Sequence, residues 1–143
     1  MTTLRLAVAG RYAERHTITQ RLAEAGLAAL PVVIMASWLD CAEECDADLT
    51  DDQAVSQAKI NRAEIGAAHA LIYVPSWKMD QYGDNWLPVW SPGRLIDVGI
   101  AFANRIPIIV VGEPEPSIYF RGELVTVCEW GNLQDTIRGA LGL

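Results

Sequence analysis

The sequence predicts an α/β fold, in which a doubly wound sheet of five parallel strands is flanked by helices. Short apolar runs alternate along the chain with segments whose apolar residues recur at helical spacing. Glycine or proline punctuates most of the junctions between them. Strands alternating with helices pair in parallel, and such a sheet is covered on both faces. The chain has 143 residues, so we expect a single domain spanning residues 1–143.

The expected strands are five short apolar runs, and each has the length of a buried strand. In chain order they cover Leu4–Ala9, 31–35, 70–74, 107–111 and 124–127. The expected helices cover residues near 18–25, 54–68, 95–103 and 133–141. Thr50 and Gln53 have the spacing of a capping box at the start of the second helix, and Gly26 marks the end of the first. Five strands in this arrangement indicate a flavodoxin-like or Rossmann-like sheet.

Residues 75–92 form the longest segment that we predict to be a loop. The segment is rich in large apolar side chains, namely Trp77, Met79, Tyr82, Trp86 and Trp90. These are too many apolar groups to leave in water. The loop is therefore expected to be either a lid over a ligand or a contact between subunits.

The composition excludes several classes of partner. The formal charge is −7, from 18 acidic and 11 basic residues, and seven of the acids lie between Asp40 and Asp52. This charge argues against a nucleic-acid-binding surface, and the short apolar runs argue against a membrane span. Three cysteines, an odd number, with no export signal near the start favour reduced thiols and a cytoplasmic protein. Cys41 and Cys45 are four residues apart, which permits a metal site, but structural thiols are the preferred interpretation.

Several common catalytic signatures are absent from the sequence. It has no G-x-G-x-x-G fingerprint, no G-x-x-x-x-G-K-[ST] phosphate loop and no G-x-S-x-G nucleophile elbow. Ligands of doubly wound sheets bind beyond the carboxyl ends of the strands. This places segments 10–14, 75–93 and 112–120 around the expected site.

Asp97 is the most informative candidate residue, because it is the acid of an otherwise apolar helix. Burying an unpaired carboxylate costs several kcal/mol, so Asp97 must lie at a cleft or be held by specific partners. It lies in the first turns of the helix, where the helix dipole favours an anion. A merely solvated carboxylate near a helix N-terminus is the alternative, and the residues alone leave both open.

The motif Gly93-x-x-x-Asp97-x-Gly99-x-Ala101, followed by residues 106–110 (Ile-Pro-Ile-Ile-Val), resembles the nucleoside 2-deoxyribosyltransferase superfamily. That superfamily includes nucleoside deoxyribosyltransferases and nucleotide N-glycosidases. Segments 9–12 and 65–72 extend the resemblance. It implies cleavage or transfer at the N-glycosidic bond of a nucleoside or nucleoside 5′-monophosphate, with no cofactor and no metal. It also implies a homodimer or a larger homo-oligomer.

The resemblance assigns catalytic roles to two positions. Asp97 stands where the superfamily has a glutamate nucleophile, and Asn61 stands where it has an aspartate that orients nucleophile and sugar. Asp97 is one methylene shorter, and Asn61 cannot carry a proton. His69, which replaces a further aspartate, is expected to be structural, and Asp80 or Asp84 is considered as a replacement carboxylate.

The resemblance also implies substrate contacts, with Tyr12 stacking on the base, Arg11 meeting a 5′-phosphate and the start of the 95–103 helix binding an anion. The candidate substrate-binding residues are Gly10, Arg11, Tyr12, Ser91, Gly93 and Arg94. Two alternatives remain open beside the enzyme. One is a catalytically degenerate nucleotide-binding or regulatory module on the same fold. The other is an interaction protein that uses the acidic segment and the tryptophan-rich loop.

Overall fold

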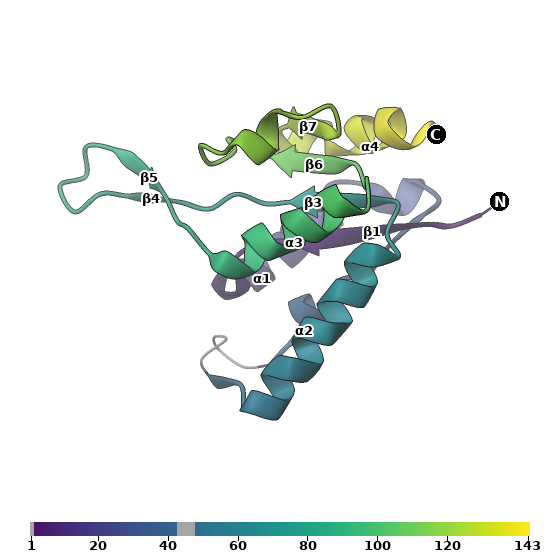
Figure 1. Ribbon diagram of the computed structural model, residues 1–143. Coiled ribbons are helices and arrows are strands. Elements are labelled where there is room, and N and C mark those ends of the chain that lie inside the picture. The colour runs from purple at the N-terminus through teal and green to yellow at the C-terminus, as the bar shows by residue number, and fades with distance from the viewer. Residues whose placement is uncertain (1, 43–47) are drawn as a thin grey trace.

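The structure is a computed structural model that describes residues 2–42 and 48–143. Its centre is a sheet of five parallel strands in the order β2-β1-β3-β6-β7 (Figure 1), which confirms the predicted α/β class. The strands are β1 (Leu4–Ala9), β2 (Val32–Ile34), β3 (Ala70–Tyr73), β6 (Ile108–Val111) and β7 (Val125–Cys128). All of β3 and β6 is buried, as expected for central strands with helices on both faces.

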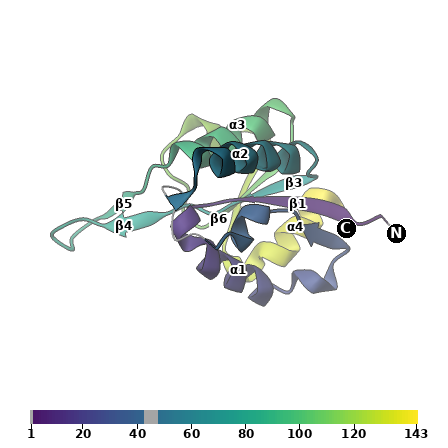
Figure 2. The same ribbon diagram turned by 90° about the horizontal axis from the view of Figure 1, so that it is seen from below.

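Four α-helices cover the two faces of the sheet. They are α1 (Arg15–Glu24), α2 (Asp51–Gly66), α3 (Pro92–Ala103) and α4 (Leu133–Leu141). Figure 2 shows α1 and α4 on one face and α2 and α3 on the other. The core is divided in the same way, because Ile18 and Ile137 belong to one buried cluster and Ile65 and Val98 belong to the other.

Local signals in the sequence set the helix boundaries. Thr50 accepts from the backbone N–H of Gln53, and the Gln53 side chain accepts from the backbone N–H of Thr50, so the predicted capping box is confirmed. Gly26 follows α1 with φ at +73°, a conformation that favours glycine. Single 3₁₀ turns occur at Tyr12–Glu14, Leu27–Ala29, Ser37–Asp40, Ile118–Arg121 and Trp130–Asn132.

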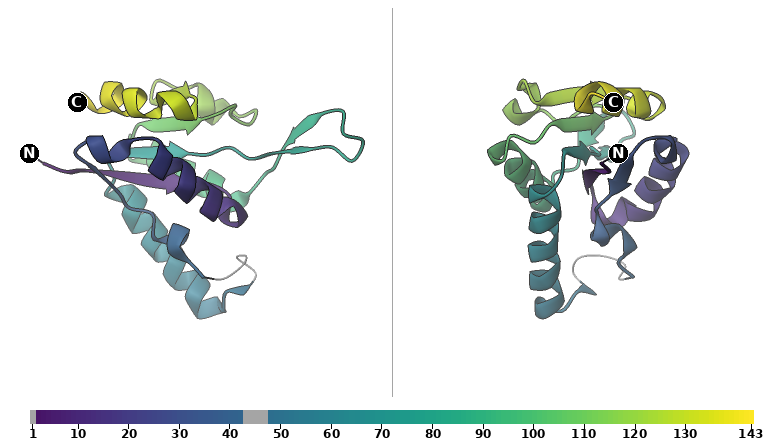
Figure 3. Two further views of the ribbon diagram at one scale, coloured as in Figure 1. Left: turned by 180° about the vertical axis from the view of Figure 1, so that it is seen from behind. Right: turned by 90° about the vertical axis from the view of Figure 1, so that its right-hand side faces the viewer.

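Residues 75–92 contain an antiparallel hairpin, so the prediction of a plain loop was wrong. Its strands are β4 (Trp77–Met79) and β5 (Trp86–Pro88). Figure 1 and the left view of Figure 3 show the hairpin projecting from the body of the molecule like an arm. Asp80 closes the turn, because its carboxylate accepts from the backbone N–H groups of Tyr82 and Asp84. Strands of three residues are too short for alternation to reveal them in a sequence.

Helix α2 reaches beyond the edge of the sheet, as the right view of Figure 3 shows. Its first ten residues are almost all exposed, and Ile65 is its one buried residue. The helix therefore contacts the sheet through its C-terminal turns and leaves its N-terminal half to form one wall of a cavity. None of the helices in the described parts of the chain has the length and apolarity that crossing a membrane requires.

Candidate active site

A cavity of about 210 Å³ lies where α2, α3 and the turn after β1 meet. The turn after β1 and the segment before α3 both follow the carboxyl ends of strands, which is where a doubly wound sheet binds its ligands. Seven of the eight predicted site residues line the cavity. The lining residues are Gly10, Tyr12, Trp38, Leu49, Ala54, Gln57, Ala58, Asn61, Ser91, Gly93, Arg94 and Asp97.

Asp97 lies on the second turn of α3 and is half-buried. Burial raises the pKa of its carboxyl from 3.8 to about 7, and no hydrogen bond or ion pair within the described residues offsets this effect. The carboxylate is thus held in a poorly solvated cavity wall, and the alternative of a freely solvated side chain does not apply. A carboxylate with this pKa is available both as a proton donor and as an anion near neutral pH.

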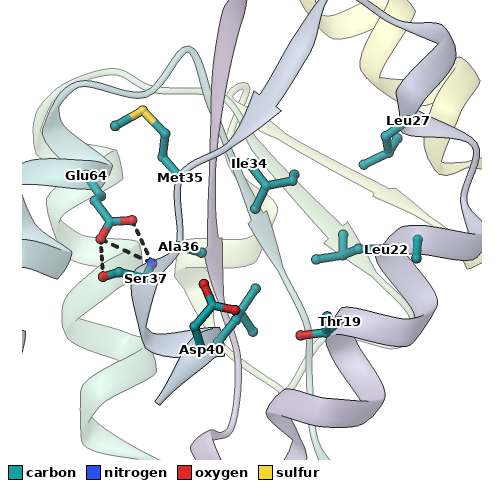
Figure 4. A pocket seen from close by; sticks show the side chains of 11 residues that line it. Thr19, Leu22, Leu27, Ile34, Met35, Ala36, Ser37, Asp40 and Glu64 are labelled. Carbon is teal, nitrogen blue, oxygen red and sulfur yellow. Dashed lines mark hydrogen bonds between the residues drawn. The ribbon is translucent and has the colours of Figure 1, made fainter. Parts of the chain in front are cut away.

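Asn61 faces the same cavity from α2 and belongs to a chain of four hydrogen-bonded side chains. Gln57 Nε2 lies 2.7 Å from Asn61 Oδ1 and 3.1 Å from Ser37 Oγ. Ser37 Oγ lies 2.5 Å from Glu64 Oε1, and the backbone N–H of Ser37 donates to the same carboxylate at 3.0 Å (Figure 4). The Cys41 thiol donates to Gln57 Oε1 at 3.6 Å.

The charge of Glu64 sets the direction of every bond in this chain. An ionised carboxylate only accepts, so the Ser37 hydroxyl must donate to it and must accept from Gln57 Nε2. The second N–H of Gln57 then donates to Asn61 Oδ1. The Asn61 amide is thereby fixed with its oxygen occupied and its Nδ2 left to donate to a ligand. A small gap lined by Glu64, Asn61 and Asp97 joins this chain to the second turn of α3.

Sequence reasoning missed Gln57 and Glu64. The available signal was their spacing from Asn61, because positions four before and three after a residue share its face of a helix. Ser37 offered no such signal, since it meets α2 only through the tertiary fold.

Two aromatic rings form the wall of the cavity next to β1. Trp38 is buried, donates from Nε1 to the Val8 carbonyl at 2.8 Å, and packs against Tyr12 with ring centroids 6.4 Å apart. The Arg15 guanidinium lies 4.6 Å from the Tyr12 ring centroid, so one face of the ring that we predicted to stack on a base is already covered. A Cβ atom at Gly10 would come within 2.6 Å of Ile18 Cδ1 and 3.5 Å of the Trp38 ring, which explains the glycine.

The N-terminus of α3 forms another wall. Ser91 is the N-cap residue, but its side chain makes no capping hydrogen bond, and Gly93 is exposed in the first turn. The first backbone N–H groups of a helix lack partners within the helix. This end of α3 therefore presents free donors together with the positive end of the helix dipole.

Arg94 also lines the cavity, but its guanidinium is held by the protein itself. It forms a buried ion pair with Glu115 at 2.9 Å and donates to the carbonyl groups of Val74 and Val89. Tyr73 donates to the same Glu115 carboxylate at 3.0 Å, and burial raises the pKa of its hydroxyl well above the ordinary value. Arg94 thus ties the start of α3 to the base of the hairpin.

Other predicted residues lie away from the cavity. Arg11 is exposed and is not among the lining residues. His69 is structural as expected, because its Nδ1 accepts from the backbone N–H of Arg5 at 2.9 Å near the start of β1. The Asp80 carboxylate is used by the hairpin turn, where the Asp84 backbone N–H above all holds its pKa below the ordinary value, so it does not replace a site carboxylate.

No metal site is evident among the residues that the structure describes. Within residues 2–42 and 48–143 no group of three histidine, cysteine or acidic side chains could hold an ion. Cys45, considered above with Cys41, lies outside these residues. Cys41 and Cys128 are free thiols.

A larger cavity of about 630 Å³ lies between α1, β2 and the Ser37–Asp40 turn (Figure 4). Its walls are mainly apolar, with Leu22 and Ile34 among them, and Glu64 and Ser37 lie at its rim. Both of these polar side chains are already engaged with each other, so this cavity offers less polar chemistry than the smaller one.

Comparison with known proteins supports the fold. No family model and no curated protein matches the sequence. Solved structures do match, including a CMP N-glycosidase from Clostridium botulinum with a TM-score of 0.56 and 18% identity, which covers 97% of this chain and 99% of that one. A 2-deoxyribosyltransferase from Bacillus psychrosaccharolyticus has a TM-score of 0.59 and 14% identity, with 92% and 90% covered. A conserved protein from Enterococcus faecalis V583 has a TM-score of 0.61 and 11% identity, with 96% and 99% covered.

These neighbours define the class of fold to which the chain is similar. At such identities the likeness establishes the α/β architecture. It agrees with the superfamily resemblance noted in the sequence.

Proposed function

We propose that this protein cleaves or transfers at the N-glycosidic bond of a nucleoside or nucleoside 5′-monophosphate. The observation that carries the proposal is one cavity that holds both Asp97, as a poorly solvated carboxylate, and Asn61, as an oriented amide donor. The similar CMP N-glycosidase and 2-deoxyribosyltransferase folds support it.

In the proposed reaction the ionised Asp97 carboxylate attacks the anomeric carbon of the sugar. The bond from that carbon to the base nitrogen breaks, and its electron pair leaves with the base, which takes a proton from water. The resulting glycosyl ester is then attacked by water, which gives hydrolysis, or by a second base, which gives transfer. Asn61 Nδ2 donates to a sugar hydroxyl or to the second oxygen of Asp97 and so holds the reactants in line.

The phosphate of a 5′-monophosphate fits the start of α3. The Ser91 hydroxyl, the first backbone N–H groups of the helix and the absence of a side chain at Gly93 together suit a small anion. Arg94 contributes by fixing the helix end, since its own charge is paired with Glu115. Arg11 stays a candidate phosphate contact on the resemblance alone.

A second candidate function is nucleotide binding without turnover. The observation that favours it is the pair of exchanges at the chemical positions, an aspartate for the superfamily glutamate at Asp97 and an amide for its aspartate at Asn61. Aspartate reaches about 1 Å less far than glutamate, and a misplacement of that size costs roughly a hundredfold in rate.

A base-release assay separates the two candidates. The purified protein is incubated with ribo- and deoxyribonucleosides and their 5′-monophosphates, with and without an acceptor base, and products are separated by chromatography. We expect base release that is lost in Asp97→Ala and retained in Asp135→Ala, a matched change at an exposed acid of α4. Folded protein that binds a nucleotide in a thermal-shift assay but releases no base would refute the enzyme and favour the binding module.

A further inference from the structure

The β4–β5 hairpin has one apolar face. Side chains that are paired across the two strands, or two residues apart along one strand, point to the same side of a hairpin. The pairs Trp77–Pro88 and Met79–Trp86 therefore share a face, whereas the Lys78–Leu87 pair lies on the other. This arm thus presents a row of apolar side chains along its whole length.

Nothing in its own chain accounts for that face. Trp86 is 63% exposed, Met79 is 41% exposed, and Tyr82 at the tip is 77% exposed. Figures 1 and 3 show the arm extending away from the sheet and the helices. An isolated two-stranded hairpin is marginally stable in water, so a hairpin of this kind needs a surface to pack on.

A matching groove runs along the exposed side of α3. It encloses about 420 Å³, and its lining includes Trp90, Leu95, Gly99, Phe102 and, from the opposite wall, Tyr119. The helical lining residues follow each other at steps of four and three, so they form one stripe along the helix. The Phe102 and Tyr119 rings pack edge to face at 5.9 Å and close one end.

Gly99 gives this groove an open floor. A Cβ atom built there meets no atom within 4 Å, so no contact within the chain requires a glycine. A glycine inside a helix costs about 1 kcal/mol relative to alanine. Glycine at such a position allows another backbone to approach the helix closely.

We propose that two copies of this chain exchange their β4–β5 arms, each arm lying in the α3 groove of the other copy. The arm leaves the body beside the start of α3 and points away from the helix (Figure 1). A two-fold axis near the start of α3 therefore lays the second copy's arm along the helix from its first turn to its last.

The dimensions of arm and groove agree. The six residues from Trp77 to Tyr82 span about 20 Å at roughly 3.3 Å per residue. The twelve residues of α3 span about 18 Å at roughly 1.5 Å per residue. An arm laid along α3 thus reaches from one end of the groove to the other.

The charges at the two ends are complementary. The tip of the arm carries Asp80 and Asp84. The far end of the groove, at Phe102, is flanked by the exposed Arg105 and Arg121. Arg105 donates its backbone N–H to the Phe102 carbonyl at 3.1 Å, and a Cβ atom at Gly122, next to Arg121, would lie 3.7 Å from the Phe102 ring.

The buried area is sufficient for a stable dimer. Eight large apolar side chains of the arm and groove are exposed: Met79, Tyr82, Trp86, Leu87, Trp90, Leu95, Phe102 and Tyr119. At roughly 100 Å² each they supply on the order of 800 Å² per copy, which is the area of a standard protein–protein interface.

Sedimentation velocity at tens of micromolar protein tests the arm exchange without reference to any catalytic activity. We expect a dimer for the unchanged protein and monomers for Trp86→Glu, on the arm, and Gly99→Gln, in the groove. Gly99→Gln has room in its own chain, so its effect reports on the second copy. The matched control Gly139→Gln, in α4 and equally unobstructed, stays dimeric, as does Val55→Glu on the exposed part of α2. Circular dichroism verifies that each variant is folded.

Three outcomes would overturn the proposal. One is an unchanged protein that is monomeric, and another is a dimer that survives both substitutions. The third is a dimer that only one of the two substitutions dissociates, because arm and groove must act together. Charge reversal gives an independent check, in which Asp84→Arg and Arg121→Asp each weaken the dimer and the double variant restores it. A double variant as weak as the single ones contradicts the assigned orientation.

Discussion

Replacing Asp97 by asparagine should stabilise the protein, and the gain should depend on pH. Burial raises the pKa of this carboxyl from 3.8 to about 7. Below pH 4 the carboxyl is protonated in both the folded and the unfolded chain, so its ionisation contributes no difference in stability. Between pH 4 and 7 the unfolded chain loses the proton while the folded protein keeps it, so the folded state becomes less stable relative to Asp97→Asn. Above pH 7 the difference is constant.

The size of the effect follows from the same two values. They lie about 3 pH units apart, and each unit corresponds to about 1.4 kcal/mol, which gives an upper limit of about 4 kcal/mol. Because Asp97 is only half-buried, solvent reduces this to a few kcal/mol. A chain of this length unfolds with an entropy for which 1 kcal/mol shifts Tm by about 3 °C. Asp97→Asn should therefore melt roughly 5–10 °C higher than the unchanged protein at pH 8.

Thermal unfolding followed by circular dichroism at pH 4, 6 and 8 measures this directly. The exposed Glu123→Gln provides the control, for which we expect almost no change in Tm at any of the three pH values. A Tm difference for Asp97→Asn that is the same at pH 4 and pH 8, or a variant less stable at pH 8, would refute the reasoning that burial destabilises the charged form.

Three further predictions follow from the site. If Asp97 is the nucleophile, kcat/KM for base release should rise with pH to a plateau above pH 7 and fall to about a tenth at pH 6, where about a tenth of the carboxyl is ionised; a pH–rate profile that is flat from 5 to 8 contradicts this. Glu64→Gln, which removes the charge that orients Asn61, should lower kcat about tenfold, the worth of one hydrogen bond to a charged group, while Asn61→Ala should lower it at least as much and the double variant no further; additive losses in steady-state assays would mean that the two act separately. Arg94→Met leaves the Glu115 carboxylate buried without its partner and should cost about 3–5 kcal/mol in urea unfolding, part of which Arg94→Met with Glu115→Gln should recover; a loss below 1 kcal/mol would show that the buried pair is not structural.

The sheet was predictable because each of its strands is a continuous apolar run. Strands buried on both faces need no alternation, so stretches such as Ile108–Val111 reveal themselves by composition alone. Helix ends were predictable for a related reason, since the Thr50 capping box is local to one turn. The hairpin was not, because its register depends on Asp80 closing the turn and its strands have three residues each.

The site was predictable only in part. The acid within an apolar helix drew attention to Asp97, and the resemblance placed Asn61 opposite it. The orientation of the Asn61 amide could not be derived from the sequence, because it depends on Ser37, which lies 27 residues from Glu64 and meets it only in the folded protein. The pairing of Arg94 with Glu115 across 21 residues is hidden for the same reason, and so its charge was assigned to the ligand.

The outer half of α2 has a consequence for how the substrate could change over time. Ala54 and Ala58 line the cavity from a stretch of helix that is exposed on its other sides and contributes no side chain to either buried cluster. Their methyl groups act as a depth stop for whatever enters opposite Asp97. Larger residues at these two positions would shorten the space for a base without disturbing the core or the reacting groups. Substrate choice and folding stability are therefore encoded at separate positions in this chain, so one can change while the other is conserved.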